Sequence, residues 1–143
     1  MGPHVVWIAI ETVVLRRKGG CVEVLLIRRP PDDKHYANLL HSPGTLLRGS
    51  DAAEGENEVP LTFDKAFTRL EQGELHLSFV GERRKVGELF FRTTRGPTLC
   101  LVYACQIAGE PKVGQFYPVD SLPKDLVKSH SFIIPMAVRA FTE

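Results

Sequence analysis

The sequence predicts a single α/β domain over residues 1–143, in which a mixed β-sheet lies between helices as an α/β/α sandwich. Three observations predict it. The order of elements is two strands, a loop, a helix, several strands and a last helix. The length of 143 residues suits one domain with a core of its own. The apolar content of 43% and charged content of 24% are ordinary for a globular protein.

The first half of the chain predicts a β-hairpin followed by a loop. Val5–Leu15 is rich in β-branched residues and predicts a strand, and Lys18-Gly19-Gly20 predicts a turn. Val22–Ile27 predicts the second strand, which Pro30 and Pro31 prevent from continuing. A polar loop then leads to the apolar pair Leu39-Leu40 and the Ser42-Pro43-Gly44 turn.

The second half alternates between helices and strands. Residues Thr62–Leu75 predict a helix, with Thr62 or Asp64 able to cap its first turn and Phe63, Ala66, Phe67, Leu70 and Leu75 near helical spacing. Strands are expected at Leu77–Val80, Glu88–Thr94, Thr98–Ile107 and Val113–Val119, and a final helix at Ser131–Phe141. The Thr98–Ile107 strand is apolar almost throughout, so both of its faces should be buried.

Composition argues against several classes of partner. The formal net charge of +1 gives no electrostatic case for a nucleic-acid surface. No apolar run approaches the roughly 20 residues of a membrane span, and residues 5–15 lack the features of a signal peptide. The three cysteines indicate a reducing compartment, so a cytoplasmic location is expected. Cys100 and Cys105 should point to opposite faces of one strand.

Several local sequences, in this order, resemble the Nudix hydrolase superfamily over nearly the whole chain. VLLIRR is similar to the family's opening strands, LLHSPGTLL to the Pro-Gly-Gly entry of the Nudix box, and GEPKVGQFYPVDSLP to the late strand and its Leu-Pro turn. The resemblance implies a Nudix-type α/β/α sandwich that recognises a nucleoside diphosphate linked to another group. It also implies phosphoanhydride hydrolysis that depends on Mg²⁺ or Mn²⁺.

The Nudix box, G-x5-E-x7-R-E-U-x-E-E-x-G-U, is degenerate in this chain. In the family, glutamates at i, i+3 and i+4 of a helix hold divalent ions, and an arginine orients a glutamate. Here Pro-Gly-Gly has become Pro43-Gly44-Thr45. The glutamate after the loop corresponds either to Asp51, counted directly from Thr45, or to Glu56, which follows Gly55.

The box helix allows two alignments. If Arg69 is the motif arginine, Leu70 and Gly73 replace two key glutamates and Glu74 alone survives. If Glu71 and Glu74 are instead the metal pair, Leu70 takes the place of the arginine and Leu75 that of the third acid. Neither alignment gives three helix carboxylates. Removing a metal-binding glutamate costs orders of magnitude in rate, so hydrolysis should be weak, divergent or lost.

Two functional hypotheses follow. A divergent hydrolase would use Asp51 or Glu56 with Glu71 and Glu74 as metal ligands, and Arg69 as an orienting residue in the active site. A catalytically silent Nudix-fold domain would bind a small ligand or another protein, with no resident metal. Substrate contacts are expected from Arg28, Arg29, Tyr36 and His41.

Each of these residues also has a purely structural interpretation. Two glutamates at helical spacing are more often a solvated helix face, Arg69 can simply pair with an acid, and His41 can be a satisfied buried histidine. Core packing is favoured over ligand stacking for the other candidate aromatics, Trp7, Phe90, Phe91 and Tyr103.

Overall fold

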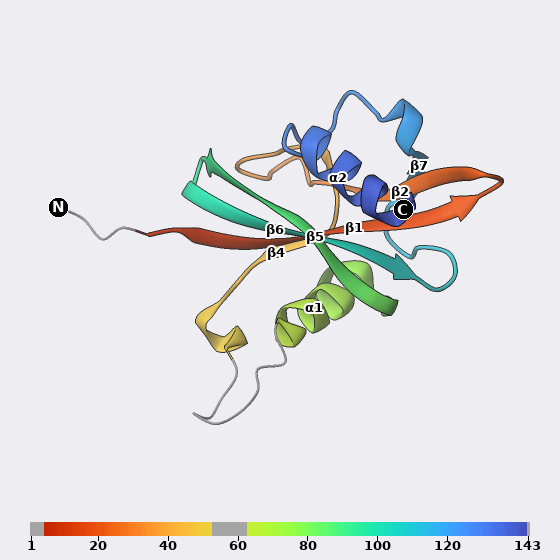
Figure 1. Cartoon of the computed structure of the whole chain (residues 1–143). Helices are drawn as coiled ribbons and strands as arrows, with labels where there is room; N and C mark the ends of the chain where they lie inside the picture. Colours follow the sequence, from red (N-terminus) through yellow and green to blue (C-terminus); the bar gives the residue numbers. More distant parts are fainter. Residues whose placement is uncertain (1–4, 53–62, 143) are drawn as a thin grey trace.

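The computed structural model describes residues 5–52 and 63–142, and within them one seven-stranded mixed sheet lies between two helices (Figure 1). The sheet follows the order β3-β2-β1-β6-β5, with β4 paired to β1 and β7 paired to β2. The strands are β1 (Trp7–Lys18), β2 (Cys21–Arg28), β3 (Leu40–His41), β4 (Gly44–Leu46), β5 (Phe79–Thr93), β6 (Gly96–Ile107) and β7 (Gln115–Pro118). The predicted hairpin and the mixed sheet are confirmed.

Strand β1 organises the sheet because it changes partners along one edge. On that edge its first part, Ala9 to Glu11, pairs antiparallel with β4, and its last part, Leu15 to Lys18, pairs antiparallel with β2. Its other edge pairs parallel with β6. The sheet therefore forks where β1 changes from pairing with β4 to pairing with β2. At this fork, the backbone N–H and the side-chain hydroxyl of Thr12 both donate to the Pro43 carbonyl oxygen.

The two helices cover opposite faces of the sheet, and each closes a core of its own (Figure 1). Helix α1 (Asp64–Leu70) continues into the π-helical turn η2 (Glu71–Leu75), and α2 (His130–Thr142) ends the described chain. Along β1, Ile10 and Val14 face the α1 core, whereas Val13 and Leu15 face the α2 core. Each large apolar side chain fully buried here contributes about 1.5–3 kcal/mol.

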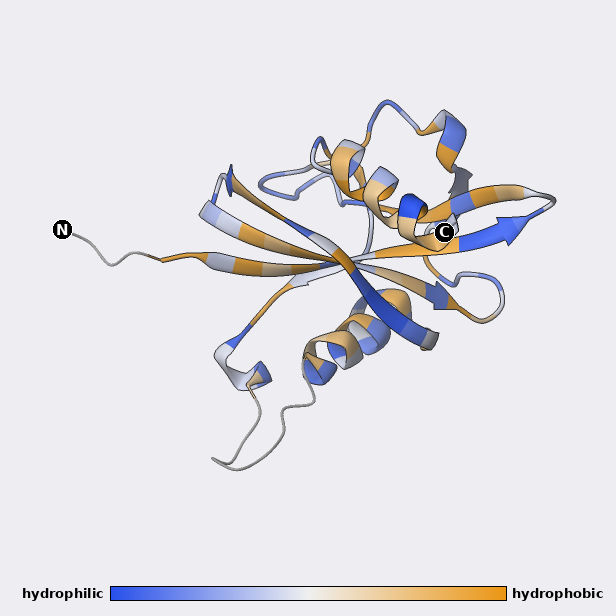
Figure 2. Cartoon of the chain, in the orientation of Figure 1, coloured by the Kyte–Doolittle hydropathy of each residue, from blue (hydrophilic) through white to orange (hydrophobic). Residues whose placement is uncertain are grey.

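The cysteines of β6 follow the same alternation. Cys100 lies in the α2 core and Cys105 in the α1 core, and both are free thiols. The expectation of opposite faces is confirmed. Figure 2 shows the apolar residues concentrated on the central strands and the helices. Among the described residues, no helix is both long and apolar enough to cross a membrane.

Two predicted boundaries were wrong. The separate strands expected at residues 77–80 and 88–94 are parts of β5, a single 15-residue strand with two register shifts. The segment between them is mostly hydrophilic (Figure 2), with Val86 as its one apolar side chain, so it lacks the alternation that indicates a strand. The box helix is regular only from Asp64 to Leu70, and Asp64 pairs with Arg83 at 2.6 Å rather than capping the helix. Thr62 lies outside the described residues.

Short 3-10 turns complete the fold. The turn η1 (Gly49–Asp51) follows β4, and η3 (Val119–Ser121) follows β7. The predicted strand at residues 113–119 is shortened to Gln115–Pro118, and η3 follows it directly. The final helix was predicted almost at its observed bounds.

Candidate functional site

A pocket of about 490 Å³ lies on the α2 side of the sheet, beside the fork in β1. Its walls come from β1, β4, β5 and β6, from the loop after β2 and from the start of α2. Three arginines line it, Arg29, Arg48 and Arg95, and Glu11 is the one carboxylate among its described lining residues. The pocket therefore has a positive wall, which suits an anionic ligand.

Glu11 lies against a glycine of the neighbouring strand. Glu11 and Gly44 are directly paired in the β1–β4 ladder. A Cβ atom on Gly44 would overlap the end of the Glu11 side chain, so a larger residue here would have to displace the carboxylate. The glycine of the Pro43-Gly44-Thr45 turn thus makes room for a carboxylate from the neighbouring strand.

Glu11 and Glu74 form an acidic pair at the fork. Burial, followed by repulsion from Glu74, raises the pKa of Glu11 to about 8, although Arg29 opposes the effect. Burial raises the pKa of Glu74 to about 7, and Arg29 and a hydrogen bond from the Gly44 backbone oppose it. Two such carboxylates do not both ionise readily, so the pair holds a proton near neutral pH.

A histidine from the other end of the chain supports the turn beneath Glu11. His130, the first residue of α2, accepts at Nε2 from the backbone N–H of Ser42 at 2.9 Å, and Ser42 Oγ lies 2.9 Å from the same nitrogen. Burial lowers the pKa of His130 to about 3, so the ring is neutral. Because Nε2 accepts, the proton must sit on Nδ1, which faces Ser129 Oγ at 3.4 Å. Ser42 Oγ is also 3.5 Å from Glu11 Oε2.

His41 contacts Glu74 without forming an ion pair. Its Nδ1 lies 2.6 Å from the Ser42 carbonyl oxygen and therefore donates, which leaves Nε2 with its lone pair 3.6 Å from Glu74 Oε1. Burial lowers the pKa of His41 to about 4, so the ring is neutral at pH 7. A protonated Glu74 matches that lone pair better than a carboxylate would.

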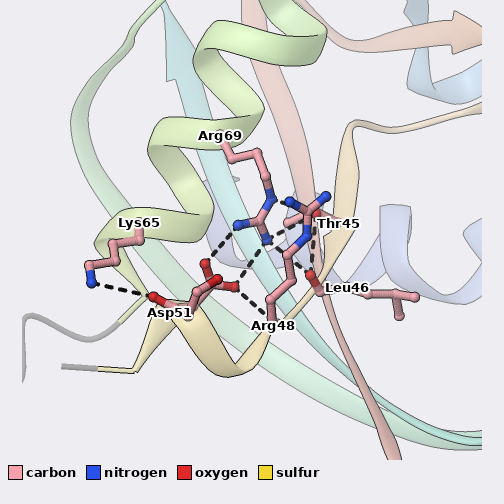
Figure 3. Close-up of polar contacts among 7 residues, drawn as sticks. Thr45, Leu46, Arg48, Asp51, Lys65 and Arg69 are labelled. Atoms are coloured by element: carbon pink, nitrogen blue, oxygen red, sulfur yellow. Dashed lines mark hydrogen bonds and ion pairs between the residues drawn. The ribbon is translucent and has the colours of Figure 1, made fainter. Parts of the chain in front are cut away.

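Asp51 and Arg69 form a clamp between η1 and α1 (Figure 3). Arg69 Nη1 donates to Asp51 Oδ1 at 2.7 Å and Nη2 to Oδ2 at 3.0 Å, while Nη2 also donates to the Leu46 carbonyl oxygen at 3.0 Å. The Arg48 backbone N–H donates to Asp51 as well. Hydrogen bonding to Arg69 holds the pKa of Asp51 below its ordinary value.

The ion pair between Asp51 and Arg69 is relevant to the two possible alignments of the box helix. The arginine of this helix orients Asp51, the acid that lies six residues beyond Thr45, which is the geometry expected if Arg69 is the motif arginine. Glu74 is then the surviving helix glutamate, and the structure places it beside Glu11. Glu71 is engaged elsewhere, because its carboxylate accepts from the Phe79 backbone N–H at 2.7 Å. Glu56 lies outside the described residues.

The donor set can be compared with the needs of a divalent ion. Mg²⁺ requires several oxygen ligands in near-octahedral geometry. Within residues 5–52 and 63–142, no group of three His, Cys, Asp or Glu side chains is placed to hold a metal. Asp51 is bound by Arg69, and Glu11 and Glu74 are two carboxylates beside the positive charge of Arg29. These described residues alone do not fit a resident magnesium ion.

Of the expected substrate contacts, the structure brings Arg29, Tyr36 and His41 to the pocket. The Arg29 guanidinium lies 5.9 Å from the Tyr36 ring centre. Arg28 lies apart from them, since it pairs with Asp125 at 2.6 Å and is not in the pocket wall.

The core interpretation was wrong for two aromatic residues. Trp7 is 39% exposed and lines the pocket, and Phe90 is 66% exposed on β5. Phe91 and Tyr103 pack against the two cores, as expected.

Sequence reasoning missed Glu11, Ser42 and His130 as site residues. Ser42 and His130 are 88 positions apart, and no local pattern joins them. Glu11 did leave a signal, because it interrupts an apolar run that otherwise predicts a buried strand. A charged residue in such a strand costs free energy unless it has partners or a function.

Comparisons with known proteins identify the fold. No family model matches the sequence, and no curated protein matches it significantly. The structure is similar to the Nudix domain of Shewanella oneidensis NrtR, complexed with ADP ribose, with a TM-score of 0.72 and 13% identity over 96% of this chain and 90% of that one. It is also similar to the Ap4A hydrolase of C. elegans, with a TM-score of 0.64 and 14% identity over 97% and 100% of the two chains.

A third similar structure is the C-terminal domain of mouse MUTYH, complexed with human PCNA. Its TM-score is 0.63, with 17% identity over 96% of this chain and 90% of that one. At these identities the similarity shows a shared fold, and the predicted Nudix-type α/β/α sandwich is confirmed.

Proposed function

We propose, from the Nudix-type fold of this chain, that it recognises a nucleoside diphosphate linked to another group, and that its hydrolysis of the phosphoanhydride is weak or lost. One observation carries the proposal. The pocket presents three arginines, whereas the box helix brings a single glutamate, Glu74, to its edge. Such a site is better equipped to bind phosphates than to cleave the bond between them.

Arg29 is the principal phosphate contact in this proposal. It lines the pocket, and its Nε forms an ion pair with the Asp33 carboxylate at 3.3 Å. A guanidinium binds phosphate oxygens through paired hydrogen bonds, so Arg29 can neutralise a diphosphate directly. Tyr36 and His41 border the same space.

The carboxylates explain why little hydrolysis is expected. In the family, magnesium held by glutamates neutralises the diphosphate and helps to activate water. If Arg69 is the motif arginine, Leu70 and Gly73 occupy two glutamate positions of the box, and the acidic pair Glu11 and Glu74 holds a proton near neutral pH. Any residual hydrolysis would depend on that pair.

Calorimetry with ADP-ribose tests the proposal, with release of AMP measured in parallel in the presence of Mg²⁺. We expect binding by the wild-type protein and AMP release far below the usual enzymatic range of about 1–10³ per second. Arg29→Gln should weaken binding at least tenfold, because a charge-assisted hydrogen bond contributes about 1.5–3 kcal/mol. Arg139→Gln, on the exposed side of α2, is the matched control.

Two results would contradict the proposal. Hydrolysis at ordinary enzymatic rates would show that the degenerate box still catalyses. Absence of any binding would favour the second hypothesis, a Nudix-fold domain that interacts with another protein, as the MUTYH domain does in its complex with PCNA.

A further inference from the structure

A second hollow, of about 400 Å³, adjoins the pocket between β5 and the start of α2. The two share five lining residues: Tyr36, Phe91, Thr93, Val127 and Ser129. These shared residues place the two hollows side by side, so a ligand in the first pocket lies next to the second.

The second hollow differs from the first in chemistry. Its floor and sides are largely apolar, with Leu89, Phe91 and Val127 inside and two phenylalanines at the rim. Those two, Phe90 and Phe132, are 66% and 62% exposed, which is unusual for phenylalanine. The charged groups among its described lining residues are Arg92 and Lys128, both positive.

We propose that this hollow binds an apolar, non-nucleoside group attached to the diphosphate, so that the ligand is a nucleoside diphosphate carrying a hydrocarbon or aryl substituent. The inference rests on the proposed function and specifies the second half of its ligand. The arginines of the first pocket hold the diphosphate, and the aromatic residues of the second remove the substituent from water.

The side chains of the hollow argue against a second nucleobase. A base is read by hydrogen bonds to its edge, for which proteins use amide and carboxylate groups as well as arginine and lysine. The described lining residues include no Asn, Gln, Asp or Glu. Two of their three hydroxyls are already engaged, since Thr93 Oγ1 contacts the Gly96 carbonyl oxygen and Thr98 Oγ1, and Ser129 Oγ faces His130; the third is the phenol of Tyr36. An apolar group needs no such partners.

The test compares two synthetic ligands by calorimetry in magnesium-free buffer, the β-benzyl and β-methyl esters of ADP. Both carry the same charge and the same nucleoside, so the difference reports on the second hollow. We expect the benzyl ester to bind about tenfold more tightly, as burial of one ring predicts. Phe132→Ser should abolish the preference while leaving the affinity for the methyl ester unchanged.

Val80→Ser is the matched control. Val80, in β5, is an exposed apolar residue like Phe132, but it lines neither hollow. It should retain the tenfold preference. Phe132 is largely exposed, so its replacement should leave the fold intact.

The outcomes separate this inference from the proposed function. Equal affinities for the two esters would overturn the apolar subsite and leave diphosphate recognition standing. A benzyl preference that survives in both Phe132→Ser and Phe90→Ser would overturn its placement in this hollow. Failure of both esters to bind would overturn the proposed function, and the inference with it.

Discussion

Replacing Glu11 with glutamine should stabilise the fold at and above neutral pH. In the folded state the pKa of Glu11 is raised from the ordinary 4.5 to about 8, first by burial and then by Glu74. A carboxyl whose pKa rises on folding contributes its full stability below pH 4.5, and that stability is lost as the pH rises through 8. Glutamine keeps the shape of a protonated glutamate and does not ionise, so it removes the loss.

The size of the effect follows from the two pKa values. Ionising Glu11 in the folded protein at pH 8 costs at most about 4 kcal/mol relative to the unfolded chain. Solvent that enters through the pocket screens the charge, so we expect Glu11→Gln to be more stable than the wild type by about 2 kcal/mol at pH 8. At pH 4 the two proteins should differ little.

Urea unfolding at a series of pH values from 4 to 9 measures this difference directly. Glu88→Gln is the control, because the Glu88 side chain is 57% exposed and should leave the pH dependence unchanged. If the free energy of unfolding of Glu11→Gln followed the wild-type curve in parallel, Glu11 would not be the buried, protonated group described above.

Three further predictions concern stability. Gly44→Ala should lower the free energy of unfolding in urea by about 1–3 kcal/mol, because the new methyl group meets Glu11. Combining Gly44→Ala with Glu11→Ala should restore most of that loss. Asp51→Asn should lower the free energy of unfolding by about 1–3 kcal/mol at pH 7, as measured by thermal melts. The difference from the wild type should shrink below pH 3.8, because Arg69 lowers the pKa of Asp51 and the stabilisation that this ion pair provides is lost as the carboxylate is protonated. The pKa of His130 is lowered from 6.5 to about 3, so the stability of the wild-type protein should fall as the pH drops from 6.5 to 3. A His130→Phe variant should lose no stability from this residue over that range, and thermal melts at a series of pH values would measure the difference. An unchanged melting temperature in Asp51→Asn, or an unchanged pH dependence in His130→Phe, would contradict these assignments.

The fold could be predicted where one physical signal dominated each segment. The β-branched run of β1 and the buried run of β6 identified the central strands, and Ala66, Phe67 and Leu70 identified the buried face of α1. The middle of β5 could not be predicted, because residues 81–87 contain one apolar side chain, Val86, and their pairing with β6 is interrupted by two register shifts. Their local sequence carries no periodicity to detect.

The site was predictable only in part, for a similar reason. The Pro-Gly turn, Arg69 and Glu74 belong to one local motif, so the sequence pointed to them. Glu11 and His130 reach the same turn from opposite ends of the chain, through strand pairing and helix packing that no short pattern encodes. Asp51 was expected among the metal ligands, and only the three-dimensional contact shows that Arg69 already binds both of its oxygens.

The most direct test of the central claim is a calorimetric titration of ADP-ribose into the wild-type protein and Arg29→Gln, in buffer containing EDTA. The arginine-lined pocket predicts saturable binding without a divalent metal, weakened at least tenfold in the variant. Binding that appears only when magnesium is added, with equal affinity in both proteins, would contradict the claim that Arg29 supplies the charge for the diphosphate.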